Sequence, residues 1–346
     1  MATEKLFLAE SSNSSDYMNS SCLMFPSNPE HCDVINIVRN ISAALSLIAC
    51  VLMLGIIWLF KKYVVFAQRL ITYLTVAAFL ESLAYLASGN VVDGGWCNFQ
   101  AGWLTFSGWS VLLWTLCLTF NLYMNVIKEI DTRKYEWVYL LLCWLISFVI
   151  SCIPYIWDKY GPAGAFCWIV EDWGWRFGIW YLPLVMFIIL LIVSYGRIVY
   201  VLRKKASSWE GTYNPDTERS HKMLKEDIKP LKFYPFVYLA VSVFPLINRL
   251  QNAISPNNNV FGLVLLASIA GPLHGTLNAV VFGMDKTTRD KLTRTQIQLA
   301  WQGRWAPKSI VHEYPHQSFG TISDSNPDFT EIDINQETST MKNAVA

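Results

Sequence analysis

Four polar side chains stand out because they interrupt stretches of sequence that are otherwise apolar. Glu81, Arg249, His274 and Asn278 each fall within a run of mostly apolar residues. Such a run is long enough to cross a lipid bilayer when it reaches about 20 residues. An ionisable side chain at bilayer depth is costly, so each one indicates a function or a partner. The chemistry open to this set is hydrogen bonding and ion pairing inside a membrane.

Two interpretations of these residues stay open from the sequence. His274 and Asn278 are four residues apart and share one face of a helix. Together with Glu81 they predict either a polar network that a ligand biases or a static set of interhelical hydrogen bonds. Arg249 either meets an anionic ligand or extends its charged end to the outer membrane interface.

Seven long apolar stretches must position these side chains. They lie at about residues 37–60, 70–91, 97–127, 137–157, 176–202, 230–253 and 260–283. At a rise of about 1.5 Å per residue, each can cross a hydrocarbon layer about 30 Å thick. The chain is 53% hydrophobic and 15% charged, whereas a soluble domain is roughly 25% charged. The sequence therefore predicts an all-α membrane protein, a seven-transmembrane helix bundle.

The basic residues predict which way the bundle faces. They concentrate in alternate connecting segments and after the last stretch, whereas the other segments hold only Lys5, Arg39, Lys159 and Arg176. By the positive-inside rule the N-terminus is outside and the C-terminus inside, as expected for a multi-pass protein of the plasma membrane.

The flanking segments follow from this orientation. We expect residues 1–36 to form an extracellular tail, in which the sequons at Asn13 and Asn19 can be glycosylated. Residues 37–284 form the bundle and residues 285–302 a helix on the membrane surface. Residues 303–346 are polar and rich in Ser and Thr, which predicts a disordered cytoplasmic tail.

Four of the eight cysteines fall in the predicted outside segments. Cys97 opens the third stretch and Cys167 lies in the second outside loop, so a bridge between them would hold that loop over the mouth of the bundle. Cys22 and Cys32 form the second expected pair.

Several classes of function are disfavoured. Residues 260–283 contain no lysine for a retinal Schiff base, and no zinc spacing, phosphate loop or nucleophile motif is present. We expect no enzyme activity, no metal and no cofactor, and no binding of nucleic acid. A transporter or channel remains the alternative to a receptor, although only Glu81, Arg249 and His274 could line a polar path.

A set of short motifs resembles the cyclic-AMP-receptor-like (family E-type) seven-helix G-protein-coupled receptors and their animal orphan relatives. The motifs are Cys97-x-x-Gln100, Trp114-Thr115, Tyr123, Cys167-Trp168-Ile169, Gly275, Asn278 and Gly283. The resemblance covers about residues 37–284. It implies the Cys97–Cys167 bridge and coupling to a heterotrimeric G protein. It does not imply that cyclic AMP is the ligand.

The sequence departs from rhodopsin-type receptors at two places. Residues 123–131 read YMNVIKEID, with no Asp-Arg-Tyr, and the last stretch ends NAVVFGMD, with no Asn-Pro-x-x-Tyr. Switch mechanisms of that class are therefore not transferred.

The leading hypothesis is a cell-surface receptor that transmits the binding of an unknown extracellular ligand to a heterotrimeric G protein. The expected contacts with the G protein are basic residues of the inner loops, namely Lys128, Arg133, Lys134, Arg203, Lys204, Lys205 and Lys225. Such residues are also common as orientation signals. The Ser and Thr residues of the tail are a further expected contact, with arrestin.

Overall fold

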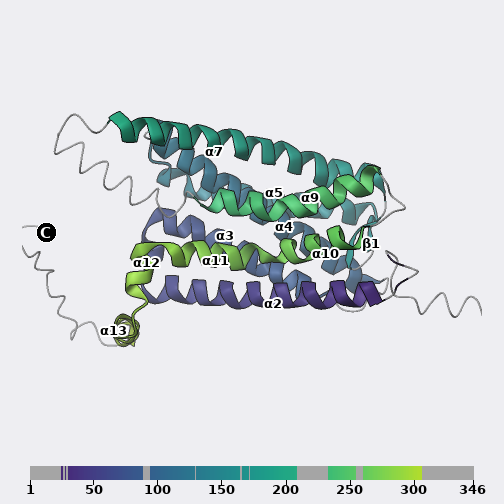
Figure 1. Ribbon diagram of the computed structural model, residues 1–346, viewed down its shortest axis with the longest axis horizontal. Helices are drawn as coiled ribbons and strands as arrows, with labels where there is room; N and C mark the ends of the chain where they lie inside the picture. The colour runs from purple at the N-terminus through teal and green to yellow at the C-terminus, as the bar shows by residue number, and fades with distance from the viewer. Residues whose placement is uncertain are drawn as a thin grey trace, which may run out of the picture. The chain divides into compact units, whose positions relative to one another are not determined.

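Long helices make up most of the structure. The computed structural model describes residues 25, 28, 30–88, 94–128, 130–163, 166–170, 172–208, 233–254 and 260–305. In this part of the chain the long helices are α2 (Glu30–Leu59), α3 (Phe66–Leu86), α4 (Gly95–Tyr123), α5 (Glu136–Ile156), α7 (Leu182–Ser208), α9 (Tyr234–Ile254) and the pair α10 (Phe261–Ala270) and α11 (His274–Met284). They lie side by side along the long axis of the molecule (Figure 1). The predicted all-α membrane helix bundle is confirmed.

Short elements connect the long helices. They are the single turns η1 (Lys62–Val64), η2 (Met124–Lys128), η3 (Arg133–Tyr135), η4 (Phe177–Tyr181) and η5 (Gly271–Leu273), the helices α6 (Trp173–Arg176), α12 (Lys286–Lys291) and α13 (Arg294–Trp305), and the strands β1 (Tyr160–Pro162) and β2 (Cys167–Ile169). The bundle thus has a hairpin end, where β1 and β2 lie, and an α12 end (Figure 1).

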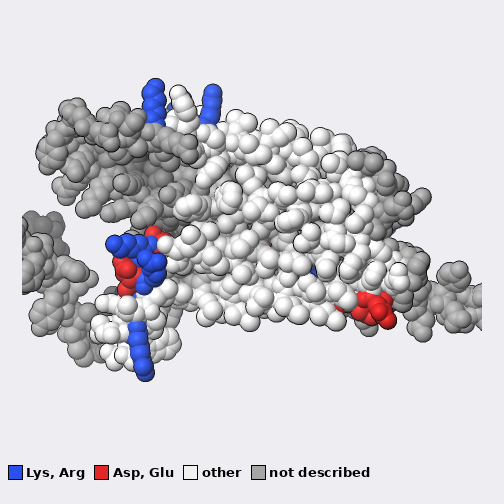
Figure 2. Space-filling view, in the orientation of Figure 1, with Lys and Arg blue, Asp and Glu red and all other residues white. Residues whose placement is uncertain are grey.

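Composition explains why these helices belong in a membrane. Within the described residues, six helices are long and apolar enough to cross a bilayer. The remaining long helix, α9, has 21 residues, but polar side chains including Asn248 and Arg249 lower its hydropathy at the hairpin end. It packs against α4, α10 and α11, and Asn248 is buried. The polar end of α9 is therefore sheltered by protein. On the face in Figure 2, Lys and Arg gather toward the α12 end and the middle of the bundle is almost free of charge.

Helix α5 shows how the sequence sorts lipid-facing from buried positions. Its buried face repeats about every fourth residue and carries mostly small side chains: Tyr139, Cys143, Ser147 and Ser151. Its exposed face is large and apolar: Trp137, Leu141, Leu145 and Phe148. Small residues let helix backbones approach closely inside a bilayer, while lipid solvates the large apolar side chains.

Helix α4 forms the centre of the bundle. It packs against α3, α5, α7 and α9, and its Trp114 and Leu118 are fully buried. The buried hydroxyls of Thr105, Thr115 and Thr119 each donate to the carbonyl four residues earlier on the same helix. These three hydroxyls are thus paired within the core of the bundle.

A close approach joins the first and last long helices. Gly275 on α11 lies so near α2 that a Cβ atom there would overlap Cys50 Sγ and Ser46 Oγ and would lie 3.1 Å from the Ser46 carbonyl oxygen. Only glycine fits at this contact, which is a function of Gly275 beyond the motif noted in the sequence.

Strand pairing and an ion pair stabilise the β-hairpin, and a disulfide fixes it to the bundle. β1 and β2 pair antiparallel, with Tyr160 opposite Ile169. A disulfide joins Cys97 of α4 to Cys167 of β2, with the Cα atoms 5.4 Å apart. Below the strands, Lys159 donates to Asp172 at 3.1 Å, and this hydrogen bond holds the pKa of Asp172 below its ordinary value. The hairpin is therefore anchored over the helices.

Helix ends differ from the sequence expectation in two regions. α2 begins at Glu30 rather than near residue 37, so Cys32 is helical and is disulfide-bonded. A polar helical turn carries no hydropathy signal, which explains the late predicted start. The single surface helix expected at 285–302 is two helices, α12 and α13. Cys22, Asn13 and Asn19 lie outside the described residues, as does the tail beyond Trp305.

Candidate functional site

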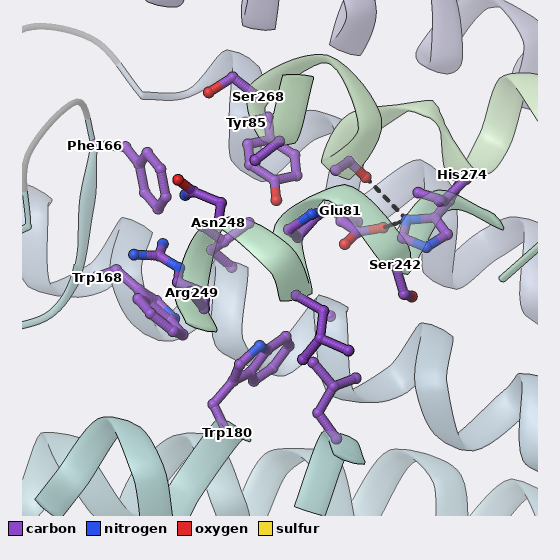
Figure 3. Close-up of a pocket in the computed structure, with 18 of the residues that line it drawn as sticks. Glu81, Tyr85, Phe166, Trp168, Trp180, Ser242, Asn248, Arg249, Ser268 and His274 are labelled. Carbon is purple, nitrogen blue, oxygen red and sulfur yellow. Dashed lines mark hydrogen bonds and ion pairs between the residues drawn. The ribbon is translucent and has the colours of Figure 1, made fainter. Parts of the chain in front are cut away.

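A cavity of about 140 Å³ opens among the helices near the hairpin. It lies between α2, α3, α4, α7, α9, α10, α11 and the hairpin, and its polar and aromatic lining includes Arg39, Glu81, Tyr85, Phe166, Trp168, Trp180, Ser242, Asn248, Arg249 and His274 (Figure 3). Since one water occupies about 10–15 Å³ by such a measure, the cavity can hold several waters or a small ligand.

Glu81 and His274 lie next to each other in the wall of this cavity. His274 Nδ1 lies 3.2 Å from Glu81 Oε2, and both side chains are almost completely buried, at 11% and 8% exposed. The same nitrogen lies 2.9 Å from the carbonyl oxygen of Gly271. This pair therefore links α3 to α11 across the bundle.

The Gly271 carbonyl that His274 contacts lies at a break in the helix beside Pro272. Proline has no N–H, and the helix tightens into the 3₁₀ turn η5 between α10 and α11. The imidazole of His274 then contacts a carbonyl at this break. The proline that interrupts the helix and the histidine that follows it thus form one local structure.

Cationic side chains lie over aromatic rings nearer the hairpin. The Arg249 guanidinium carbon lies 5.2 Å from the centre of the Trp168 ring, and that of Arg39 lies 5.6 Å from the centre of Phe166. Arg39 is only 1% exposed. Trp168 follows Cys167 directly, so the disulfide also fixes the ring over which Arg249 lies. A planar cation over an aromatic face is a favourable contact.

Three of the four polar residues singled out in the sequence line this cavity together. They are Glu81, Arg249 and His274. Asn278 is buried one turn further along α11 and is absent from the cavity lining. Arg39, which the sequence indicated only as an outer charge, was missed as a site residue. Its position near the start of an apolar stretch gave no sign that it faces inward.

The basic residues expected to contact a G protein lie toward the α12 end where they are described. Lys128, Arg133, Lys134 and Lys204 are exposed. Arg203 and Lys205 belong to the last turns of α7, but their side chains lie outside the described set, and so does all of Lys225.

The α12 end also contains an ion pair that the sequence did not suggest. Arg69 of α3 donates from Nε and Nη2 to the two carboxylate oxygens of Glu136 on α5, both at 2.7 Å. Tyr73 donates to the same carboxylate at 2.9 Å. The partners are 67 residues apart in the sequence, so no local pattern could predict the pair.

A buried lysine ties η1 to α12. Lys62 Nζ donates to the hydroxyl of Thr288 and lies 4.8 Å from the centre of the Phe282 ring. Asp285 caps α12 by accepting from the Thr288 amide at 3.2 Å. Burial lowers the pKa of Lys62 to about 8, although the nearby Asp285 carboxylate acts in the opposite direction.

Comparison with known proteins gives one family and several distant relatives. The family model described as slime mold cyclic AMP receptor matches residues 27–291. The chain is 24% identical to cyclic AMP receptor-like protein A of Dictyostelium discoideum, over 74% of this chain and 66% of that protein. It is 27% identical to cyclic AMP receptor 1 of the same organism, over 68% and 60%. It is 23% identical to G-protein coupled receptor 1 of Arabidopsis thaliana, over 84% and 93%. The chain thus spans less than two thirds of the length of the two slime mold relatives.

Proposed function

Because the chain belongs to the slime mold cyclic AMP receptor family, we propose that it is a receptor that couples an extracellular ligand to a heterotrimeric G protein. It is a multi-pass protein of the plasma membrane. In this proposal the hairpin end faces outside and the α12 end faces the cytoplasm, in agreement with the basic residues of the connecting segments.

The cationic cavity is the observation that carries this proposal. Arg39 and Arg249 supply two guanidinium groups near aromatic rings in a largely buried space. Such a lining favours a ligand with an anionic group and a flat ring. Two relatives are named as cyclic AMP receptors or receptor-like proteins. Cyclic AMP has both chemical features, so it is the first ligand to test, among other small anionic ring compounds.

Signal transmission would use a two-state movement of the bundle. Ligand contacts at the hairpin end would favour one arrangement of the helices, and the α12 end would then admit the G protein. Pro245, inside α9, lines the cavity and offers a bending point. The G protein would meet Lys128, Arg133, Lys134 and the basic end of α7.

G-protein activation reporters for every subtype, in cells that express the chain, test the proposal. We expect activation, with or without cyclic AMP, that falls in Arg249→Ala and recovers in part in Arg249→Lys, which keeps the charge. Glu81→Ala should change the response because it removes the partner of His274. Cell-surface labelling must show equal expression of each variant.

Silence with every subtype, at normal surface expression, would refute the proposal. Flux of an ion or solute into vesicles containing the purified chain would then support the transporter or channel alternative. Arrestin recruitment through the Ser- and Thr-containing tail is a separate expectation, measured by the same cells with an arrestin reporter.

A further inference from the structure

The two ring nitrogens of His274 face different surroundings. Nδ1 lies near two acceptors, the Glu81 carboxylate at 3.2 Å and the Gly271 carbonyl at 2.9 Å. A proton on Nδ1 satisfies both contacts, whereas a lone pair there would repel both oxygens. The neutral ring therefore carries its hydrogen on Nδ1.

Nε2 is then a lone-pair acceptor without a donor. In the part of the chain that the structure describes, this nitrogen is buried and has no hydrogen-bond partner. The whole residue is 9% exposed and belongs to the cavity lining. In Figure 3 the free side of the ring points away from Glu81, toward Ser242 of α9. A buried acceptor with no partner is unfavourable unless something binds to it.

We propose that the cavity binds a proton at His274 Nε2, which makes the protein sensitive to the pH on the hairpin side. The proton comes from water and forms one N–H bond without breaking any bond of the protein. The product is an imidazolium whose positive charge lies beside the Glu81 carboxylate. Its effect on signalling, though not the binding itself, rests on the receptor function proposed above.

Of the titratable and charged groups around His274, the Glu81 carboxylate favours the protonated imidazole. The others are either positively charged, and so disfavour protonation, or neutral. From the elements packed around His274 they are Glu81 and Tyr85 on α3, Arg39 and Cys50 on α2, and Tyr238 and Arg249 on α9, while the charges of α12 lie at the opposite end of the bundle. Glu81 is the group in direct contact. The Tyr238 ring also stacks on the imidazole, with centroids 5.3 Å apart and planes at 25°, and an aromatic face attracts a cation.

Protonation would change the contact between α11 and α9. Neutral Nε2 can only accept a hydrogen bond, whereas protonated Nε2 can only donate one. Ser242 of α9 is buried and lines the same cavity as His274. A small rearrangement would let the imidazolium donate to the Ser242 hydroxyl. One proton could thus connect α3, α11 and α9, and α9 carries Pro245.

Histidine NMR of the purified chain in detergent micelles tests the binding directly. With ¹³C-labelled imidazoles, one signal that titrates in the wild type should be absent in His274→Asn. Asn keeps an N–H to donate to Glu81 but has no second ring nitrogen. In Glu81→Gln the titration of the same signal should differ from that in the wild type, because the carboxylate beside the ring is gone.

His31→Asn is the matched control, since His31 also lies near the hairpin end and stacks on Phe261 at 4.1 Å. It should remove a different signal and leave the His274 titration unchanged. If the His274 signal does not titrate between pH 5 and 8, or titrates identically in Glu81→Gln, the proposed proton site is wrong.

Signalling is measured separately with the G-protein reporters, at external pH 5.5 to 7.5. A pH-dependent response in the wild type that is flat in His274→Asn supports the proposal. If NMR shows the titration but every reporter is silent, the proton site stands and the receptor function fails. If the reporters respond to pH equally in His274→Asn, the site does not control signalling and that part of the proposal is overturned.

Discussion

Replacing Arg69 with lysine keeps the positive charge at the α12 end but removes the planar guanidinium group, which donates from two nitrogens at once. Arg69 makes two hydrogen bonds of 2.7 Å to the Glu136 carboxylate, and lysine can replace only one of them in the same geometry. A hydrogen bond to a charged group contributes about 1.5–3 kcal/mol. Because the two side chains are 27% and 18% exposed, solvent screening reduces the expected loss of unfolding free energy to about 1–2 kcal/mol.

The unfolding temperature in detergent micelles measures this loss. Cys50 and Cys143 are free and buried, so a fluorogenic maleimide reacts with them when the bundle opens. Since 1 kcal/mol corresponds to about 2–4 °C, Arg69→Lys should unfold about 2–8 °C lower than the wild type. Arg289→Lys, on the exposed surface of α12, should shift the temperature by less than about 2 °C.

Two results would refute this reasoning. Arg69→Lys could behave like Arg289→Lys, in which case the planar guanidinium group contributes nothing measurable. Alternatively, Glu136→Gln could cost as much in the Arg69→Lys background as in the wild type. The two residues would then act independently, because coupled partners give a smaller combined loss than the sum of the single losses.

Three further perturbations follow from contacts in the bundle. Gly275→Ala should lower the unfolding temperature by an amount equivalent to about 1–3 kcal/mol, because its Cβ overlaps α2. Gly283→Ala is the control: a Cβ there meets nothing within 4 Å, so the substitution should be neutral or stabilising. Equal effects of the two substitutions would contradict the close contact at Gly275. Lys62 has a pKa of about 8 in the folded protein, below its ordinary 10.5, so the unfolded chain binds more protons between these values and stability should rise with pH there; Lys62→Met should lack this rise between pH 8 and 10. Replacing both Cys97 and Cys167 with serine should cost about 4 kcal/mol, because the bridge closes a loop with a sequence separation of 70 residues; an unchanged unfolding temperature would show that the bridge is dispensable for stability.

The fold was predictable because a helix that spans a bilayer needs a continuous run of about 20 apolar residues, and such a run can be recognised in the sequence. Helix length and hydropathy located the long helices, including α5, whose exposed face is large and apolar. α9 was located despite its polar end, since the residues before Asn248 are mostly apolar. The start of α2 was not, because residues 30–36 continue the helix without an apolar signal.

The candidate site was only partly predictable. The sequence indicates how deep a residue lies in the membrane, but it does not indicate whether the side chain points into the bundle or toward lipid. Glu81, Arg249 and His274 stood out by their cost in lipid, and they do line one cavity. Arg39 lies on a helix that is apolar on most sides, so nothing in the sequence told which face turns inward. Trp168 and Phe166 reach the cavity only because the hairpin folds over it, which depends on a contact across the chain.

The glycine at position 275 has a mechanical consequence for any change of state. With no side chain between them, α2 and α11 touch backbone to side chain, and sliding one along the other would drive Cys50 and Ser46 into the next residue of α11. We therefore expect α2 and α11 to move together in any change of state. If protonation of His274 moves a helix, we expect the movement in α9, which contacts the other side of the histidine through Tyr238 and contains Pro245.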